Sequence, residues 1–461
     1  MTALRAEKGF YKRALMIAVP IMIQNGITNF VSMLDNIMVG RLGTDPMSGV
    51  AIVNELMFIW YLALFGGLSG ISIFTAQFYG KKDHDGIRYA FRLMWMLVVI
   101  LAVAGILVFL AVDTPLISLF LHEDGGAGNL AATLRYAERY LGTMLIGLAP
   151  LGITQVYSAT LKSCGETVAP MKASVVAVAV NLIGNYILIY GKLGMPAMGV
   201  VGAAIATVAS RFVEMLILIL HVHRSAGKYP FIQGAYASLY VPKDLVVSCI
   251  RKGLPLLFNE TLWSCGMAFL TQSYSLRGLS VIAAFNISQT ITNVFAVVFI
   301  NMGSAIGIII GQELGTGRTE RVREDADSLI AFAVLICLGT AAAQFAVAGA
   351  FPEIYNTSAD IRHIAAGLIR INAVCMPLFS FSNAAYFVLR SGGKTMITFF
   401  FDSMYTFILP LPLAFVLSRY TDMPILYLYL LVQLTEIVKC MIGGILVKKG
   451  IWINDITQYE S

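Results

Sequence analysis

Four acidic residues lie well inside long apolar stretches of this sequence, where an acid can hold a proton or a cation: Asp35, Glu214, Glu260 and Asp402. A charged side chain costs about 2.5–3.5 kcal/mol at the centre of a membrane-spanning helix. Four unpaired acids facing lipid would cost about 10 kcal/mol, which is comparable to the stability of a whole domain. We therefore expect these acids to face a water-filled cavity or one another.

Asp35 lies in a stripe of polar residues. Positions 25, 28, 29, 32, 35 and 36 follow the i, i+3, i+4, i+7 spacing that places side chains on one face of a helix. The stripe consists of Asn25, Thr28, Asn29, Ser32, Asp35 and Asn36. Such a stripe forms either a close contact between helices or the wall of a wet cavity, and we favour the cavity wall.

Asn181 and Asn185 lie four residues apart in another apolar stretch, so their amides share one helix face. Together with the Asp35 carboxylate they offer oxygen ligands of the kind that hard cations prefer. The three residues can form a Na⁺ site, or they can surround an Asp35 that carries a proton. The alternative role of the two amides is structural hydrogen bonding between helices.

Glu260 and Asp402 are the corresponding candidates in the second half of the chain. When the sequence is offset by 235 residues, Glu260 falls opposite Asn25, so each half carries a polar group there. We favour proton-carrying or cation-carrying roles for both acids. The alternative for Asp402 is a solvated position near the start of its helix.

Other polar features have simpler explanations. Glu214 and Glu436 each lie three residues from a basic residue, Arg211 and Lys439, and we expect ion pairs within each helix. No ATP-binding motif is present, because the SGGKT segment is preceded by Val388 where a phosphate loop needs glycine. The six cysteines form no C-x-x-C pair, so neither a zinc site nor a disulfide framework is indicated. We expect no cofactor apart from a coupling ion.

The composition identifies the elements that must position these residues. Of 461 residues, 58% are hydrophobic and 13% are charged, and the mean hydropathy is +0.78. An average soluble chain is about 45–50% apolar and about 25% charged. We therefore predict an all-α polytopic membrane protein surrounded by lipid, and the lack of a long basic tract argues against nucleic acid as a partner. Twelve spanning helices are expected, over residues 14–39, 47–79, 89–112, 133–161, 168–190, 196–221, 246–273, 280–311, 328–350, 364–389, 396–418 and 424–447.

Basic residues predict the orientation of these helices. One alternating set of connecting segments contains 22 Lys and Arg residues, whereas the other set contains 7. Since cytoplasmic segments are rich in Lys and Arg, both termini should be cytoplasmic. An even number of helices agrees with that arrangement.

An internal repeat predicts two lobes of six helices. At an offset of 235 residues Pro20 falls on Pro255, and AQFYG at 76–80 falls on GQELG at 311–315. At 228 residues, LKSCGET at 161–167 falls on LRSGGKT at 389–395. Six is even, so the lobes share one orientation and are related by a pseudo-two-fold axis along the membrane normal. We place the lobes at 1–230 and 231–461, with the linker at about 222–243.

The sequence resembles the multidrug and toxic compound extrusion (MATE) family. The segments that carry the resemblance are AVP (18–20), MLDNIMVGRLG (33–43), AQFYG, LKSCGET, NLIGNYILIYGKLGMPAMGVVGAAIAT (181–207), GLPLLFNETLW (253–263) and LRSGGKT. The resemblance implies two lobes that form a V around a central cavity. It also implies export of a substrate in exchange for inward H⁺ or Na⁺ by alternating access.

Individual positions match residues that the family uses. Asp35 matches its first-helix coupling acid, Asn181 and Asn185 its fifth-helix polar pair, and Thr207 a threonine near that pair. Pro20 matches a proline associated with bending of the first helix.

Glu260 matches a glutamate that one bacterial branch uses for its cation. That branch pairs the glutamate with an aspartate on the tenth helix, and the corresponding place in this sequence is around Phe379. Asp402 on the eleventh helix is the candidate substitute.

These observations predict a transporter, not an enzyme, in the cytoplasmic membrane of a bacterial-type cell. We expect a monomeric antiporter of amphipathic, cationic organic compounds, with a substrate cavity that includes Asn25, Asp35, Glu260 and Asp402. The alternatives are a flippase or exporter of a lipid-linked or polar metabolite, and an intramembrane enzyme. A flippase cavity would be rich in Arg, and such an enzyme would need Asp-rich or His-rich motifs at helix ends.

Overall fold

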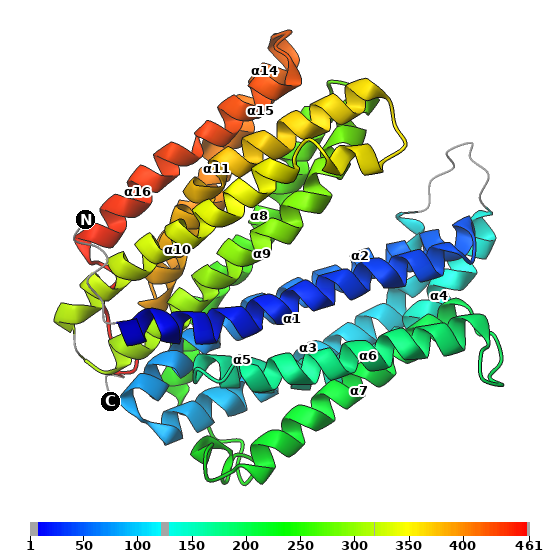
Figure 1. The fold of residues 1–461 in the computed structure, drawn as a ribbon. Coiled ribbons are helices and arrows are strands. Elements are labelled where there is room, and N and C mark those ends of the chain that lie inside the picture. The colour runs from blue at the N-terminus through cyan, green and yellow to red at the C-terminus, as the bar shows by residue number, and fades with distance from the viewer. Residues whose placement is uncertain (1–7, 121–128, 318, 459–461) are drawn as a thin grey trace. The chain divides into compact units, whose positions relative to one another are not determined.

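The computed structural model describes residues 8–120, 129–317 and 319–458, and within these ranges the chain is helical with no β-strand. Figure 1 shows the helices along the chain. Arg5 and Arg318, two of the 22 basic residues counted above, lie outside the described residues. The predicted all-α fold is confirmed.

The first half of the chain forms six long helical segments. They are α1 (Lys8–Gly40), α2 (Thr44–Lys81), α3 (His84–Ser118), α4 (Leu130–Ile146) followed by α5 (Leu148–Ser163), α6 (Val168–Tyr190) and α7 (Val200–Arg224). A short 3₁₀ helix, η1 (Pro230–Ile232), lies in the predicted linker.

The second half forms six more segments. They are α8 (Lys243–Ser275), α9 (Leu279–Gly315), α10 (Thr319–Val347), α11 (Ala359–Ser391), the run α12 (Thr395–Phe399), η3 (Phe400–Met404), α13 (Tyr405–Ile408) and α14 (Pro410–Tyr420), and the pair α15 (Ile425–Leu434) and α16 (Glu436–Lys449). A 3₁₀ turn, η2 (Phe351–Ile354), precedes α11.

Most of these segments are long and apolar enough to cross a bilayer. Ten satisfy that test on their own, and the bent pair α4 and α5 adds an eleventh. The remaining segment, α8, is as long as α11 at 33 residues but carries Arg251, Lys252 and Glu260, which lower its mean hydropathy. The predicted twelve helices are therefore present.

Several of the spans are kinked or interrupted. The axes of α4 and α5 differ by 46° across Gly147. In the eleventh span, residues Phe400–Met404 form a π-helical turn that contains Asp402. Such turns insert an extra residue into an α-helix and are frequent at functional sites. By contrast, α1 continues without interruption past Pro20.

The chain divides into two compact units. The N-unit consists of Ile23–Thr75 and Asp83–Val246, and the C-unit consists of Met1–Met22, Ala76–Lys82 and Val247–Ser461. The boundary between the two units divides α1 after Met22, two residues beyond Pro20. Most of each unit comes from one half of the chain, and the lobe boundary that we place at residue 230 stays a prediction.

Within the C-unit, the repeated glycines allow the ends of α2 and α9 to cross at backbone distance. A Cβ atom at Gly80 would lie 1.9 Å from the carbonyl oxygen of Gln312, and one at Gly315 would lie 2.0 Å from that of Gln77. Each glycine therefore contacts the glutamine of the other copy of the motif. Only glycine permits this approach, which explains why both copies carry it.

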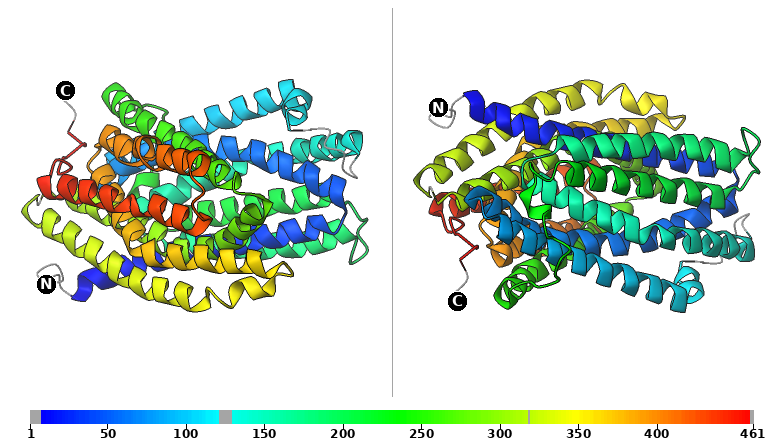
Figure 2. Two further views of the ribbon diagram at one scale, coloured as in Figure 1. Left: turned by 90° about the horizontal axis from the view of Figure 1, so that it is seen from above. Right: turned by 90° about the horizontal axis from the view of Figure 1, so that it is seen from below.

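The C-terminal segment packs against the same end of α2. The side chain of Gln77 donates to the carbonyl oxygens of Ser391 and Asn454 at 3.0 and 3.1 Å, and it accepts from the amide of Ile456 at 2.9 Å. Trp452 is fully buried. The start of α1 and the end of α16 also lie at one end of this unit (Figures 1 and 2).

Candidate functional site

Asp35 on α1 lies against the two asparagines of α6 in the N-unit. The Asn185 amide nitrogen Nδ2 donates to Asp35 Oδ1 at 2.6 Å. With the Asn181 amide oriented so that its oxygen accepts from the Thr207 hydroxyl, its nitrogen lies 3.0 Å from Asp35 Oδ1 and 3.2 Å from Oδ2. The structure therefore brings together Asp35, Asn181, Asn185 and Thr207, which the sequence analysis had placed on three separate helices.

Burial shields most of this group of side chains from water. Asn181 and Asn185 are only 5% and 1% exposed, whereas Asp35 is half-buried. The Asn185 oxygen Oδ1 is buried and has no hydrogen-bond partner among the described residues. An unsatisfied buried acceptor costs about 1–3 kcal/mol. The Asn185 oxygen is therefore available to accept a hydrogen bond or to bind a small cation.

A second polar chain crosses the N-unit from α1 through α6 to α7. The Gln24 amide donates to the Ser174 hydroxyl at 2.7 Å, and that hydroxyl donates to Glu214. The prediction of an ion pair between Glu214 and Arg211 is wrong. The Arg211 guanidinium instead donates to the Tyr61 hydroxyl at 2.9 Å, because its side chain points toward α2.

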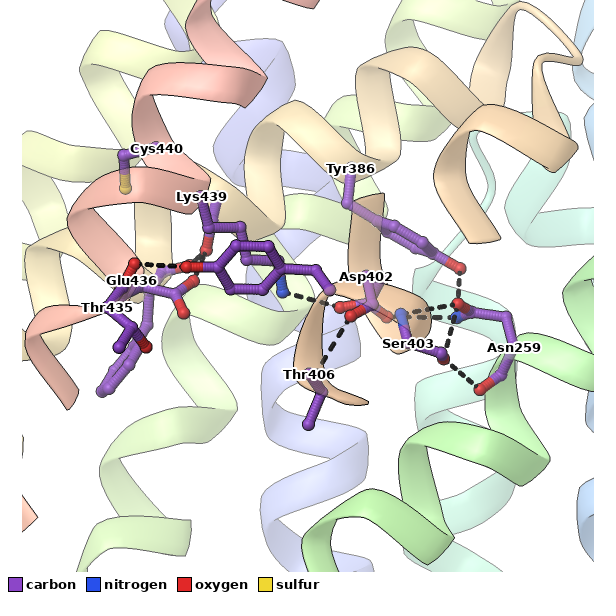
Figure 3. Close-up of polar contacts among 12 residues, drawn as sticks. Asn259, Tyr386, Asp402, Ser403, Thr406, Thr435, Glu436, Lys439 and Cys440 are labelled. Atoms are coloured by element: carbon purple, nitrogen blue, oxygen red, sulfur yellow. Dashed lines mark hydrogen bonds and ion pairs between the residues drawn. The ribbon is translucent and has the colours of Figure 1, made fainter. Parts of the chain in front are cut away.

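The C-unit has a polar chain that involves Asp402 (Figure 3). The Lys439 ammonium Nζ of α16 lies 2.8 Å from Asp402 Oδ1, and the Asn259 amide of α8 donates to Oδ2 at 3.1 Å. Asn259 is 1% exposed, and its own oxygen accepts from the Ser403 hydroxyl at 2.7 Å. Both carboxylate oxygens of Asp402 therefore have partners.

The prediction of an ion pair between Glu436 and Lys439 is also wrong. Lys439 reaches across to α12–α14 and pairs with Asp402, while Glu436 accepts from the Ser382 hydroxyl of α11. Figure 3 shows the two side chains pointing in different directions from α16. Spacing along one helix permitted the local pair, but the neighbouring helices supply better partners to each.

Glu260 follows Asn259 on α8 and is half-buried. In the part of the chain that the structure describes, its carboxylate makes no hydrogen bond, and the charges that act on it are those of Arg390 and Asp402. Asn25 is likewise half-buried, on α1. The carboxylates of Glu260 and Asp402 therefore lie close enough to interact electrostatically, but they do not form a hydrogen-bonded pair.

Sequence reasoning missed several partners in these chains, above all Gln24, Ser174 and Asn259. A signal was available, since Gln24 falls on Asn259 at the 235-residue offset and Ser174 falls on Asp402 at the 228-residue offset. The partnership of Lys439 with Asp402 was hidden by the closer spacing of Lys439 to Glu436.

Comparison with known proteins gives matches over nearly the whole chain. The family model MatE matches residues 20–187 and 255–416. A protein of Halalkalibacterium halodurans named "Probable multidrug resistance protein NorM" is 24% identical over 444 residues, which cover 95% of this chain and 93% of that protein.

Solved structures share the fold. A crystal structure of MATE in the bent conformation superposes with a TM-score of 0.83 at 21% identity, covering 97% of both chains. A MOP superfamily transporter from Pyrococcus furiosus, described as having a binding pocket of reverse polarity, superposes with a TM-score of 0.81 at 22% identity. That comparison covers 97% of this chain and 98% of the other.

Proposed function

Because the chain belongs to the MATE family and is therefore a transporter and not an enzyme, we propose that it is a secondary active antiporter. It exports amphipathic, cationic organic compounds in exchange for H⁺ or Na⁺ by alternating access. The transporter lies in the cell membrane as a monomer, with both termini in the cytoplasm.

The contacts of Asp35 are the observation that supports this proposal best. An ionised Asp35 accepts hydrogen bonds from Asn185, and from Asn181 in its favoured amide orientation. A proton on Asp35 removes one acceptor position, and a Na⁺ ion beside it competes with the amide hydrogens. Either event changes how α1 packs against α6, and so couples the ion to a helix rearrangement.

Substrate release follows from competition for the same carboxylate. An organic cation near Asp35 is held by the ionised form, and arrival of H⁺ or Na⁺ neutralises that charge. Of the acids expected to bind substrate, Asp35 and Glu260 have no basic side chain within ion-pair distance among the described residues, whereas Asp402 pairs with Lys439.

Transport in proteoliposomes tests the proposal. Purified protein is reconstituted, and movement of a fluorescent organic cation is followed under a pH gradient alone and under a Na⁺ gradient alone. Movement under one gradient identifies antiport and its ion. If neither gradient moves the cation, while a lipid-linked or polar metabolite crosses without a gradient, the protein is a flippase or metabolite carrier and the proposal is wrong.

A further inference from the structure

The two polar chains described above occupy equivalent places in the repeat. Gln24 and Asn259 correspond at the 235-residue offset, and Ser174 and Asp402 correspond at the 228-residue offset. Each chain then ends on the last helix of its half, at Glu214 in α7 and at Lys439 in α16. Asp402 is therefore the counterpart of Ser174, a structural bridge between helices.

Among the described residues of the C-unit, the Asp35 site has no such counterpart. At the same offsets, Asp35 falls on Leu270 and Asn185 falls on Leu413. Leu270 is 8% exposed and belongs to an apolar cluster with Tyr274 and Leu428, and Leu413 packs against that cluster. The place that is polar in the N-unit is thus hydrophobic in the C-unit.

Asp402, by contrast, already has a cation beside it. Lys439 and Asp402 have side chains that are 12% and 19% exposed, with nitrogen and oxygen 2.8 Å apart. The Lys439 ammonium also lies 5.5 Å from the ring centre of Phe401 and 5.9 Å from that of Tyr405, where aromatic faces attract cations. Asn259 occupies the second carboxylate oxygen.

Other charged residues nearby do not replace Lys439 as the partner of Asp402. Glu436 lies one helical turn before Lys439 and acts on its ammonium, but its own carboxylate is bound by Ser382. Glu260 and Arg390 are the other charged residues in this environment, and Arg390 is packed over the rings of Tyr386 and Phe387. Lys439 is consequently the cation that Asp402 contacts.

We propose that Lys439 is a tethered cation, which fills at Asp402 the place that a mobile Na⁺ ion or proton would take, so that Asp402 takes no part in ion exchange. The exclusion of Asp402 from exchange rests on the function proposed above, whereas occupancy of Asp402 by Lys439 does not. Lys439 is thereby a residue that limits how many ions the transporter exchanges. Removing its ammonium frees Asp402 to bind a cation.

Melting temperatures in detergent test the occupancy directly and require no transport. The background is Asp35→Asn, which removes the N-unit carboxylate, and each protein is melted in NaCl and in choline chloride at equal ionic strength. We expect Na⁺ to raise the melting temperature of Asp35→Asn/Lys439→Met by several degrees more than that of Asp35→Asn. Lys449→Met in the same background is the matched control, because Lys449 is an exposed cation at the end of the same helix. If the Met variant does not fold, Lys439→Gln replaces it.

Gradient-driven transport tests the consequence for coupling. The double variant Lys439→Met/Asp402→Asn removes both charges together, which proteins tolerate better than removal of one. It should transport within about threefold of wild type, whereas Asp35→Asn should lose more than about tenfold.

Two results would overturn the inference. One is a folded Lys439→Met/Asp402→Asn variant that transports as poorly as Asp35→Asn. The other is a Na⁺-dependent rise in melting temperature that is absent from Asp35→Asn/Lys439→Met, or that is equally large in Asp35→Asn. A wild type that moves no cation under either gradient would refute the proposed antiport instead, and the melting result would still decide the role of Lys439.

Discussion

At the scale of single residues, the partners of each acid distinguish its role. Asp35 meets neutral amides, with one amide oxygen left over, so its charge is available to a ligand. Asp402 meets an ammonium, so its charge is compensated. The sequence identified both residues as acids in apolar stretches. It could not distinguish them, because Lys439, the partner of Asp402, lies on another helix and 37 residues further along the chain.

The loop between α5 and α6 offers a pH test at this scale. Burial by itself raises the pKa of the Glu166 carboxyl, but the hydrogen bond and charge of Lys228 outweigh burial and hold the pKa below its usual value. Because the folded pKa is lowered, Glu166 stabilises the fold above about pH 4.3, its unfolded pKa. That contribution is lost as the pH falls through the folded pKa.

We expect Glu166→Gln to lower the melting temperature at pH 7 and to have no effect at a pH below the folded pKa. The loss should be under about 1 kcal/mol, since Lys228 is largely exposed and its pair with Glu166 is screened by water. In a Lys228→Met background the same substitution should have a smaller effect at pH 7. An equal effect at every pH, or in both backgrounds, would contradict the ion pair.

At the scale of elements, apolar periodicity predicted the helices well and their interruptions poorly. The predicted helix over 168–190 has the same bounds as α6, and the predicted helix over 280–311 lies within α9. The bend at Gly147 and the π turn at Phe400–Met404 were missed, because both lie inside continuous apolar stretches. Backbone irregularities of this kind are determined by packing against neighbouring helices and leave little trace in composition.

The crossing of α2 and α9 gives a prediction about glycine. Gly80→Ala should destabilise the protein by about 1–3 kcal/mol, since the new methyl group must displace the backbone of Gln312. Gly339→Ala is the control, because a Cβ atom there meets nothing within 4 Å inside α10. It should be neutral or stabilising by about 0.5–1 kcal/mol. Melting temperatures in detergent measure both, and equal losses would contradict the close crossing.

The C-terminal segment gives a second prediction about elements. Gln77→Ala should lower the melting temperature and make residues 450–458 more sensitive to protease, because three backbone groups lose their buried partner. The expected loss is about 1–3 kcal/mol. Gln233→Ala, an exposed glutamine in the linker, is the control and should behave as wild type. Unchanged proteolysis of the segment in Gln77→Ala would contradict its attachment to α2.

At the scale of the whole molecule, the internal repeat predicted twelve helices in the order found. What it could not predict is where the two halves differ chemically. Asp35 falls on Leu270 and Asn185 falls on Leu413, so these backbone positions are polar in one half and apolar in the other. A repeat in sequence determines topology, whereas function depends on the positions at which the copies diverge.

The distribution of basic residues predicts both termini on the cytoplasmic side. A green fluorescent protein fused to the C-terminus should therefore fluoresce in a bacterial host, and an alkaline phosphatase fused there should be inactive. The reverse pattern would place the C-terminus outside and contradict the orientation derived from Lys and Arg.

The most direct test of the account is the ion-driven transport of an organic cation by wild type and Asp35→Asn in proteoliposomes. Asp85→Asn is the control, since Asp85 is a solvent-exposed carboxylate of the same unit that pairs with Arg88 at the surface. We predict that wild type and Asp85→Asn transport under the same gradient, and that folded Asp35→Asn does not. Unchanged gradient-driven transport by Asp35→Asn would contradict the assignment of ion coupling to the Asp35 site.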